Sequence, residues 1–285
     1  MNRRDCRFLL FACSLTTFLL LLPNMAAQDR AHDLAGQAGA AKAAKCQNVQ
    51  TMRDCHDNYP TGCNTAAMYD AYLNFLKNQK PDPSLSPESV LAFQDFTNLE
   101  KKIPSGLSSN NHASHSSQLA DLGEGNIQAL VGYLYAVKQE KNESCNCQLT
   151  DPDAVDFHMW VGFDASSAVK VQKKLLKPAA LAALKKKSII VEMTPHYRAE
   201  VHPKWTYQSV SPMVGRQVKV VGQLLLDNDH YKLSQDCGMS GASKTQCWRA
   251  TVWELHPVIQ FYVCAQGTAC AADSSAWKSL DDMLP

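Results

Sequence analysis

Apolar residues along this chain change from a helical spacing to a strand spacing near residue 126. Before that point, apolar residues on one helix face predict a helix over residues 64–78. A Ser-Pro start predicts a second helix over residues 86–99. The stretch 107–125, rich in Ser, Asn, His and Gly, is predicted to be a loop. We therefore expect residues 28–125 to be a flexible lead-in followed by a helical N-terminal segment.

Beyond residue 126, short apolar runs with a period of two predict five strands. A short helical turn is predicted over residues 206–214, between the third and fourth strands. The fold class is therefore mainly β, with a barrel domain over residues 126–264 and a tail over 265–285. The predicted strands cover residues 127–138, 155–163, 188–194, 217–227 and 249–263.

A lysine-rich insert, residues 169–187, separates the second and third predicted strands. Its leucines could form one apolar side, and Pro178 must kink or restart the helix. One interpretation is a solvated helix packed over one end of the barrel. The other is a docking patch for phosphate or an acidic polymer, in which Lys173 and Lys174 would bind the ligand.

The element order β-β-β-α-β-β resembles the OB-fold, a five-stranded Greek-key barrel. The resemblance covers residues 126–264 and includes the pattern Gly-x-x-Val-x-Val-x-Gly from Gly215 to Gly222, in which glycine suits the bends of a small barrel. It implies that the second strand pairs with the third and the fifth with the first. It also implies a binding face around the second and third strands.

Three further phrases are similar to phrases in secreted bacterial hypothetical proteins. They are Cys145-Asn146-Cys147, Asp156-Phe157-His158 and Trp253-Glu254-Leu255-His256-Pro257. This resemblance implies a family but no particular reaction.

The N-terminus has the pattern of a secretory signal peptide over residues 1–27: basic residues, an apolar run over 8–22, and small residues before Gln28. The apolar run is shorter than the roughly 20 residues that a membrane-spanning helix needs. We expect a secreted or periplasmic mature chain without a transmembrane segment.

The charge balance narrows the classes of possible partner, and the cysteines predict disulfides. Without the predicted signal peptide, 25 of the 28 basic and 26 of the 27 acidic residues remain, so no global positive field recruits nucleic acid. Nine of the 11 cysteines also remain, and in an oxidising compartment they are expected to form disulfides. Spacing favours Cys237 with Cys247 and Cys264 with Cys270, and the odd number leaves one thiol over.

Strand parity groups carboxylates and imidazoles on three predicted strands, because side chains two residues apart point to the same side. If these groups converge, they have the ligand types of a zinc or manganese site, or of an acid/base pair. The alternative is that they are ordinary outward polar residues. The candidates are Asp156 and His158 on the second strand, Glu192 and His196 on or just after the third, and Glu254 and His256 on the fifth. A second group, Asp227, Asp229 and His230, is also explained by a hydrogen-bonded turn.

Aromatic residues near strand ends support a binding role. Trp160, Tyr197 and Trp248 are candidate stacking platforms, although each is also a candidate for the core. The nucleophile elbow, the His-Glu-x-x-His zinc motif, the P-loop and the dinucleotide motif are all absent. Three functions remain: a disulfide-stabilised module that binds a polymer, glycan or protein; a metal-dependent, phosphodiesterase-like hydrolase; and a structural envelope protein.

Overall fold

The computed structural model describes residues 49–56, 62, 71–141, 143–266 and 269–285. The predicted signal peptide over residues 1–27 and most of the predicted lead-in lie outside the described residues. The first part of the helix predicted over residues 64–78 lies outside them too.

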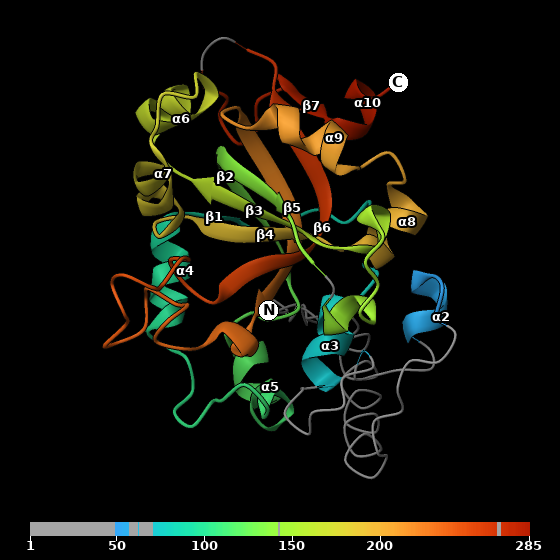
Figure 1. Ribbon diagram of the computed structural model, residues 1–285, viewed down its shortest axis with the longest axis vertical. Helices are drawn as coiled ribbons and strands as arrows, with labels where there is room; N and C mark the ends of the chain where they lie inside the picture. The colour runs from blue at the N-terminus through green and yellow to red at the C-terminus, as the bar shows by residue number, and fades with distance from the viewer. Residues whose placement is uncertain (1–48, 57–61, 63–70, 142, 267–268) are drawn as a thin grey trace, which may run out of the picture.

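A closed five-stranded barrel forms the centre of the molecule (Figure 1). Four neighbouring pairs are antiparallel, while β4 and β6 run parallel and meet at Val191 and Leu255. The five predicted strands are thus present, and the mainly β-barrel prediction is confirmed at that level. In order around the barrel the strands are β2 (Ile127–Gln139), β3 (Phe157–Gly162), β4 (Ile189–Met193), β6 (Trp253–Cys264) and β5 (Gln217–Leu226).

The position of β6 differs from the prediction. We expected the fifth barrel strand to pair with the first, but β6 lies between β4 and β5. Both edges of β2 are occupied, by β3 on one side and β5 on the other, so β6 cannot pair there. As a result, β3, β4 and β6 are consecutive in the barrel wall.

Two short strands extend the sheet. Strand β1 (Val90–Leu91) runs parallel to β2, and β7 (Trp277–Ser279) runs antiparallel to β6. Val90 and Leu91 were predicted to be helical, but their pairing with β2 delays the helix to α4 (Phe93–Glu100).

Apolar residues at alternate positions along the strands fill the barrel interior. Phe157, Met159 and Val161 on β3 are fully buried in the main core, together with Val191 and Leu255. The residues between them on β3 point to the other side of the wall, as a period of two requires. Ile259 does not share the core of Leu255: it packs in a separate cluster with Tyr197 and Val221, beyond register shifts between β5 and β6 near Gly222.

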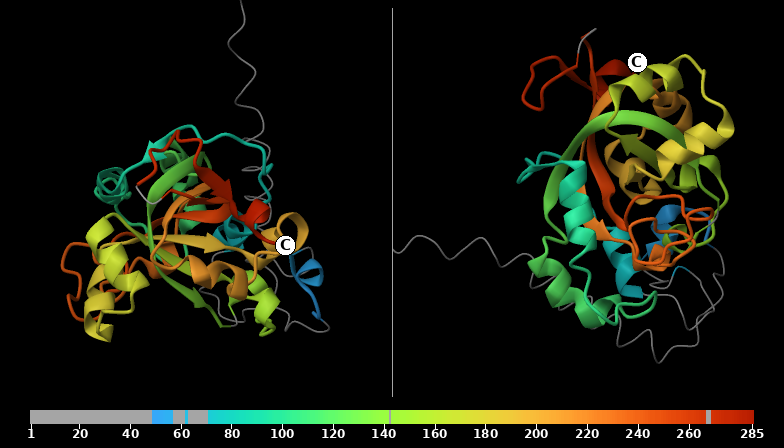
Figure 2. Two further views of the ribbon diagram at one scale, coloured as in Figure 1. Left: turned by 90° about the horizontal axis from the view of Figure 1, so that it is seen from above. Right: turned by 90° about the vertical axis from the view of Figure 1, so that its left-hand side faces the viewer.

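Helices cover the barrel from several sides, and Figures 1 and 2 place the insert and α8 (Pro195–Val201) on opposite sides. The lysine-rich insert contains the end of helix α6 (Ala165–Gln172) and all of helix α7 (Pro178–Lys185), and α7 begins at Pro178. The loop predicted over residues 107–125 contains a helix instead, because Leu119 packs into the main core and His112 is buried beside Asn228 and Glu124.

The remaining α-helices are α2 (Met52–His56), α3 (Ala71–Lys77), α5 (His112–Asp121), α9 (Tyr207–Val210) and α10 (Leu280–Met283). None of the helices in the described part of the chain combines the length and apolar character needed to span a bilayer.

Within the part of the chain that the structure describes, three disulfides connect segments around the barrel. Cys237–Cys247 and Cys264–Cys270 are the two pairs that spacing favoured, with Cα atoms 5.2 and 5.9 Å apart. Cys55–Cys147 connects α2 to the segment between β2 and β3. Cys145 is a free, buried thiol.

Candidate functional site

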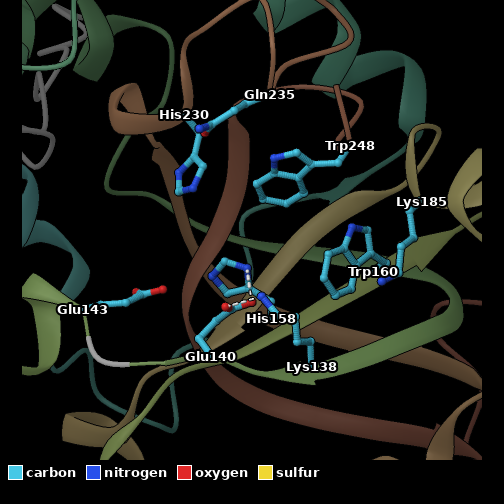
Figure 3. A pocket seen from close by; sticks show the side chains of 9 residues that line it. All are labelled: Lys138, Glu140, Glu143, His158, Trp160, Lys185, His230, Gln235 and Trp248. Atoms are coloured by element: carbon cyan, nitrogen blue, oxygen red, sulfur yellow. Dashed lines mark hydrogen bonds and ion pairs between the residues drawn. The ribbon is translucent and has the colours of Figure 1, made fainter. Parts of the chain in front are cut away.

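A cavity of about 390 Å³ lies on the side of β3 that faces away from the barrel core (Figure 3). Three parts of the chain supply most of its walls: the end of β2 with the segment that follows, the outer face of β3, and the long segment 227–252 between β5 and β6. Helix α7 contributes its last residue. The lining residues are Lys138, Glu140, Glu143, His158, Trp160, Lys185, His230, Gln235 and Trp248.

Two tryptophans and a histidine give this cavity aromatic walls. The Trp160 and Trp248 rings are 6.0 Å apart between centroids and inclined by 65°. The His158 ring, on β3, lies 6.2 Å from each tryptophan ring between centroids and is nearly parallel to Trp248 (Figure 3). Lys185 places its Nζ 3.7 Å from the Trp160 ring centroid. The walls can therefore stack against a flat ligand face, while charged groups stand at the edge.

His158 is held through both ring nitrogens. Its Nε2 lies 2.8 Å from Glu192 Oε1, and its Nδ1 lies 3.2 Å from Glu140 Oε1. Burial by itself lowers the pKa of His158, but the charge and hydrogen bond of Glu192, followed by Glu143 and Glu140, outweigh burial and raise the pKa to about 9. The cavity floor thus carries an imidazolium with fixed orientation.

A buried polar network continues behind His158. Glu192 Oε2 lies 3.1 Å from His256 Nδ1, which is also 3.1 Å from Glu254 Oε1, and Arg249 contacts the other oxygen of Glu254. Burial lowers the pKa of His256, but Glu192 and then Glu254 outweigh it and raise the pKa to about 10. Burial raises the pKa of Glu192, but the two imidazoles hold it well below its ordinary value.

Asp227 connects this network to a second cavity histidine. Its Oδ2 lies 2.6 Å from His230 Nδ1, 3.0 Å from Lys77 Nζ and 3.7 Å from Arg249 Nη1. Asp227 is fully buried, yet His230 and Lys77 outweigh burial and hold its pKa well below the ordinary value. A carboxylate on Nδ1 fixes the orientation of the His230 ring, which lines the cavity.

Asp156 and its neighbours form the remaining edge of the network. The Cys145 thiol donates to Asp156 Oδ2 at 2.9 Å, and Glu143 Oε2 lies 3.4 Å from the same sulfur. Burial, followed by repulsion from Asp156, raises the pKa of Glu143 to about 7. Burial also raises the pKa of Asp156. Glu143 therefore presents a carboxyl group to the cavity that changes charge near neutral pH.

Most of the strand-borne candidates lie together. Asp156, His158, Glu192, Glu254 and His256 come from three consecutive strands and share one network. They point away from the barrel core, but segments 143–147 and 227–252 cover them, so they are buried instead of forming an outward polar face. His196 lies in the first turn of α8 and belongs to none of the metal-type ligand groups among the described residues.

The predicted binding residues divide between the cavity and other places. Trp160 and Trp248 line the cavity. Tyr197 does not, because it packs with Ile259 and its hydroxyl donates to the Pro81 carbonyl at 3.1 Å. Lys173 and Lys174 are exposed at the end of α6 and are not among the cavity residues.

Several residues of the site were missed by sequence reasoning. Glu140, Glu143 and Gln235 line the cavity, and Lys77 reaches Asp227 from the end of α3. The first three come from segments without periodic patterning, so alternation gives no signal for them. The 17 positions between β2 and β3 and the long segment before β6 were the indirect sign, because long connections frequently carry function.

Among the described residues, three groups of side chains have metal-type ligands whose atoms lie within 4.8 Å of one another. The groups are Glu143 with Cys145 and Asp156, Asp156 with Glu192 and His256, and Glu192 with Asp227 and Glu254. The last two lie behind the cavity floor rather than in its lining.

Comparisons of the chain with protein-family models, curated proteins and solved structures give no match. Function must therefore be argued from the geometry of the site itself.

Proposed function

We propose that this chain is an exported, disulfide-stabilised OB-fold module whose cavity binds the end of a saccharide polymer. The closed five-stranded barrel and the helices between β4 and β5 support the fold assignment. OB-folds bind oligosaccharides and oligonucleotides on the face of the second and third strands, between the first–second and fourth–fifth loops. The cavity takes its walls from the corresponding places, including β3 and segment 227–252.

The single observation that carries the ligand class is the pairing of tryptophan walls with polar groups of both signs. Trp160 and Trp248 suit the apolar face of a sugar ring, and Glu140, Gln235 and Lys138 suit its hydroxyl groups. A nucleic-acid groove would need consistently positive walls, whereas Glu140 and Glu143 place carboxyl groups in this one. A saccharide therefore fits better than an oligonucleotide.

Support for a fixed binding wall comes from the Cys237–Cys247 disulfide. Trp248 follows Cys247 directly, and its backbone N–H donates to the Gln235 carbonyl at 3.0 Å. The disulfide and this hydrogen bond hold the tryptophan wall in place without a bound ligand, which reduces the entropy lost on binding.

The test is a glycan microarray screen of the exported mature protein, followed by fluorescence titration with cellotetraose, chitotetraose and the octanucleotide dT8. We expect saccharide binding that Trp248→Ala weakens about tenfold or more, the usual effect of removing one stacking partner. Trp277→Ala, which removes a tryptophan outside the cavity, is the matched control and should leave binding unchanged. No saccharide binding by the wild type, or binding of dT8 alone, would reject the saccharide assignment.

A second candidate function, hydrolysis of the bound polymer, is favoured by the Asp227–His230 pair. A buried carboxylate on Nδ1 leaves Nε2 of a cavity histidine as the proton-accepting atom, the arrangement of a general base. Incubation of the wild type with saccharides found on the array, and with bis(p-nitrophenyl) phosphate, tests this by product analysis. Turnover that falls about a hundredfold in His230→Gln while binding is retained supports a hydrolase. Binding without turnover leaves a binding module.

A further inference from the structure

We propose that Asp156, Glu192 and His256 form a buried site for a divalent metal ion, zinc or manganese, behind the floor of the cavity. Asp156 immediately precedes β3, Glu192 lies on β4 and His256 on β6, so each ligand comes from a different strand of the rigid barrel wall. Their ligand atoms lie within 4.8 Å of one another, and all three side chains have 0% exposure. The site goes beyond the proposed function, because none of the three residues lines the cavity.

A second observation points to an occupant. Asp156 Oδ1 and His256 Nε2 are buried, and neither makes a hydrogen bond within the described residues. Leaving a buried carboxylate oxygen and an imidazole nitrogen without partners is costly, and such atoms normally have a protein, water or ion partner. Both atoms belong to side chains of this ligand group, and a bound metal ion is a partner of the kind that they lack.

A divalent ion would take the place of protons in this network. The fully buried carboxylates outnumber the fixed cations by two, and without a metal the protonated imidazoles of His158 and His256 supply the missing positive charge. An ion of charge +2 would supply it in place of the imidazole protons, because a metal ligand must be a neutral imidazole. The carboxylates are Asp156, Glu192, Asp227 and Glu254, and the fixed cations are Lys77 and Arg249.

The other two ligand groups are weaker candidates because their members are already engaged. Asp227 is contacted by Lys77 and His230, and Glu254 by Arg249. In the remaining group, the Cys145 thiol already donates to Asp156 Oδ2. Of the three groups, the one with His256 is the one in which more than one side chain retains a donor atom without a hydrogen bond.

The ligand set selects the class of metal. An imidazole with two carboxylates suits Zn²⁺ or Mn²⁺, whereas Ca²⁺ prefers six to eight oxygen ligands. A bound ion would also fix Glu192, whose other oxygen lies 2.8 Å from His158. The metal would thereby position the imidazole at the cavity floor.

The experiment uses the exported mature chain, purified without chelator or histidine tag. Bound metal is measured by elemental mass spectrometry, and the chelator-treated protein is then titrated with ZnCl₂ and MnCl₂ by calorimetry and thermal unfolding. We expect about one equivalent of one metal. A hundredfold excess over its dissociation constant should raise the unfolding midpoint by about 5–10 °C.

Asp156→Asn keeps the shape of the side chain but removes its charge, and we expect it to lose the metal and the thermal shift. His112→Gln is the matched control: His112 is also fully buried, and it pairs with Glu124 away from this site, so metal binding should be unchanged. A wild type that binds neither metal at millimolar concentration would overturn the proposal, even if Asp156→Asn fails to fold. Equal metal binding by a folded Asp156→Asn variant would overturn it as well.

Discussion

His158 and Glu192 are direct register partners of β3 and β4, and the ring Nε2 lies 2.8 Å from the carboxylate Oε1. Both side chains are buried, and Glu192 also contacts His256 at 3.1 Å. One carboxylate therefore stabilises two buried imidazolium groups. Its removal leaves both without their main counter-charge.

Glu192→Gln is expected to lower the free energy of unfolding by about 3–5 kcal/mol, the usual cost of breaking a buried ion pair from one side. Urea unfolding followed by circular dichroism measures the change. Glu200→Gln removes the exposed partner of Lys80 and should cost less than about 1 kcal/mol. Equal effects of the two substitutions would mean that the buried network contributes little to stability.

Alternation of residues made much of this network predictable. A period of two is a local property, so it placed Asp156 with His158 and Glu254 with His256 on a common side. It could not place β6 next to β4, because that pairing joins residues about sixty positions apart, Val191 and Leu255. That single adjacency brings the groups together.

Burial of the site was not predictable from the strands. Segments 143–147 and 227–252 cover the outer faces of β3 and β4, and neither has a periodic pattern. Helix α5 was missed for the same kind of reason: its Ser- and His-rich sequence favours a loop, and contacts of His112 and Leu119 with distant residues outweigh that preference.

The carboxyl groups of Asp236 and Glu100 predict that the stability of the protein depends on pH. Asp236 is buried, and burial followed by the charge and hydrogen bond of Glu100 raises its pKa to about 8, from an ordinary value of 3.8. The folded state therefore keeps a proton that the unfolded chain releases above about pH 4. Stability from this group is present at low pH and is lost as pH rises toward 8, by up to about 1.4 kcal/mol per pH unit.

Asp236→Asn cannot release this proton, so its stability relative to the wild type should increase steadily between pH 5 and pH 8. Urea unfolding at pH 5, 6.5 and 8 gives the difference. Glu100→Gln removes the charge that repels the Asp236 carboxylate, so the free energy of unfolding should fall less steeply with pH than in the wild type. A difference between wild type and Asp236→Asn that stays constant over this range would contradict the assigned proton.

Cys145 should be protected from alkylation in the folded protein. Its side chain is 1% exposed, and its thiol donates to Asp156 at 2.9 Å, so a reagent must wait for local unfolding. We expect N-ethylmaleimide to label Cys145 only after urea is added, as measured by mass spectrometry of the peptide that contains it. Rapid labelling of Cys145 without urea would contradict this expectation and would mean that segment 143–147 opens frequently.

The disulfides should differ in their contributions to stability according to the loops that they close. Cys55–Cys147 spans 92 positions and Cys264–Cys270 only 6, and a longer loop loses more entropy in the unfolded chain. Replacing the first pair by alanines should lower the free energy of unfolding by about 4–5 kcal/mol, and replacing the second by about 2 kcal/mol. All four cysteines are buried, so the loss of packing is comparable and the loop term separates the two variants. Equal losses in urea unfolding would show that native-state contacts, not loop closure, determine what each bridge contributes.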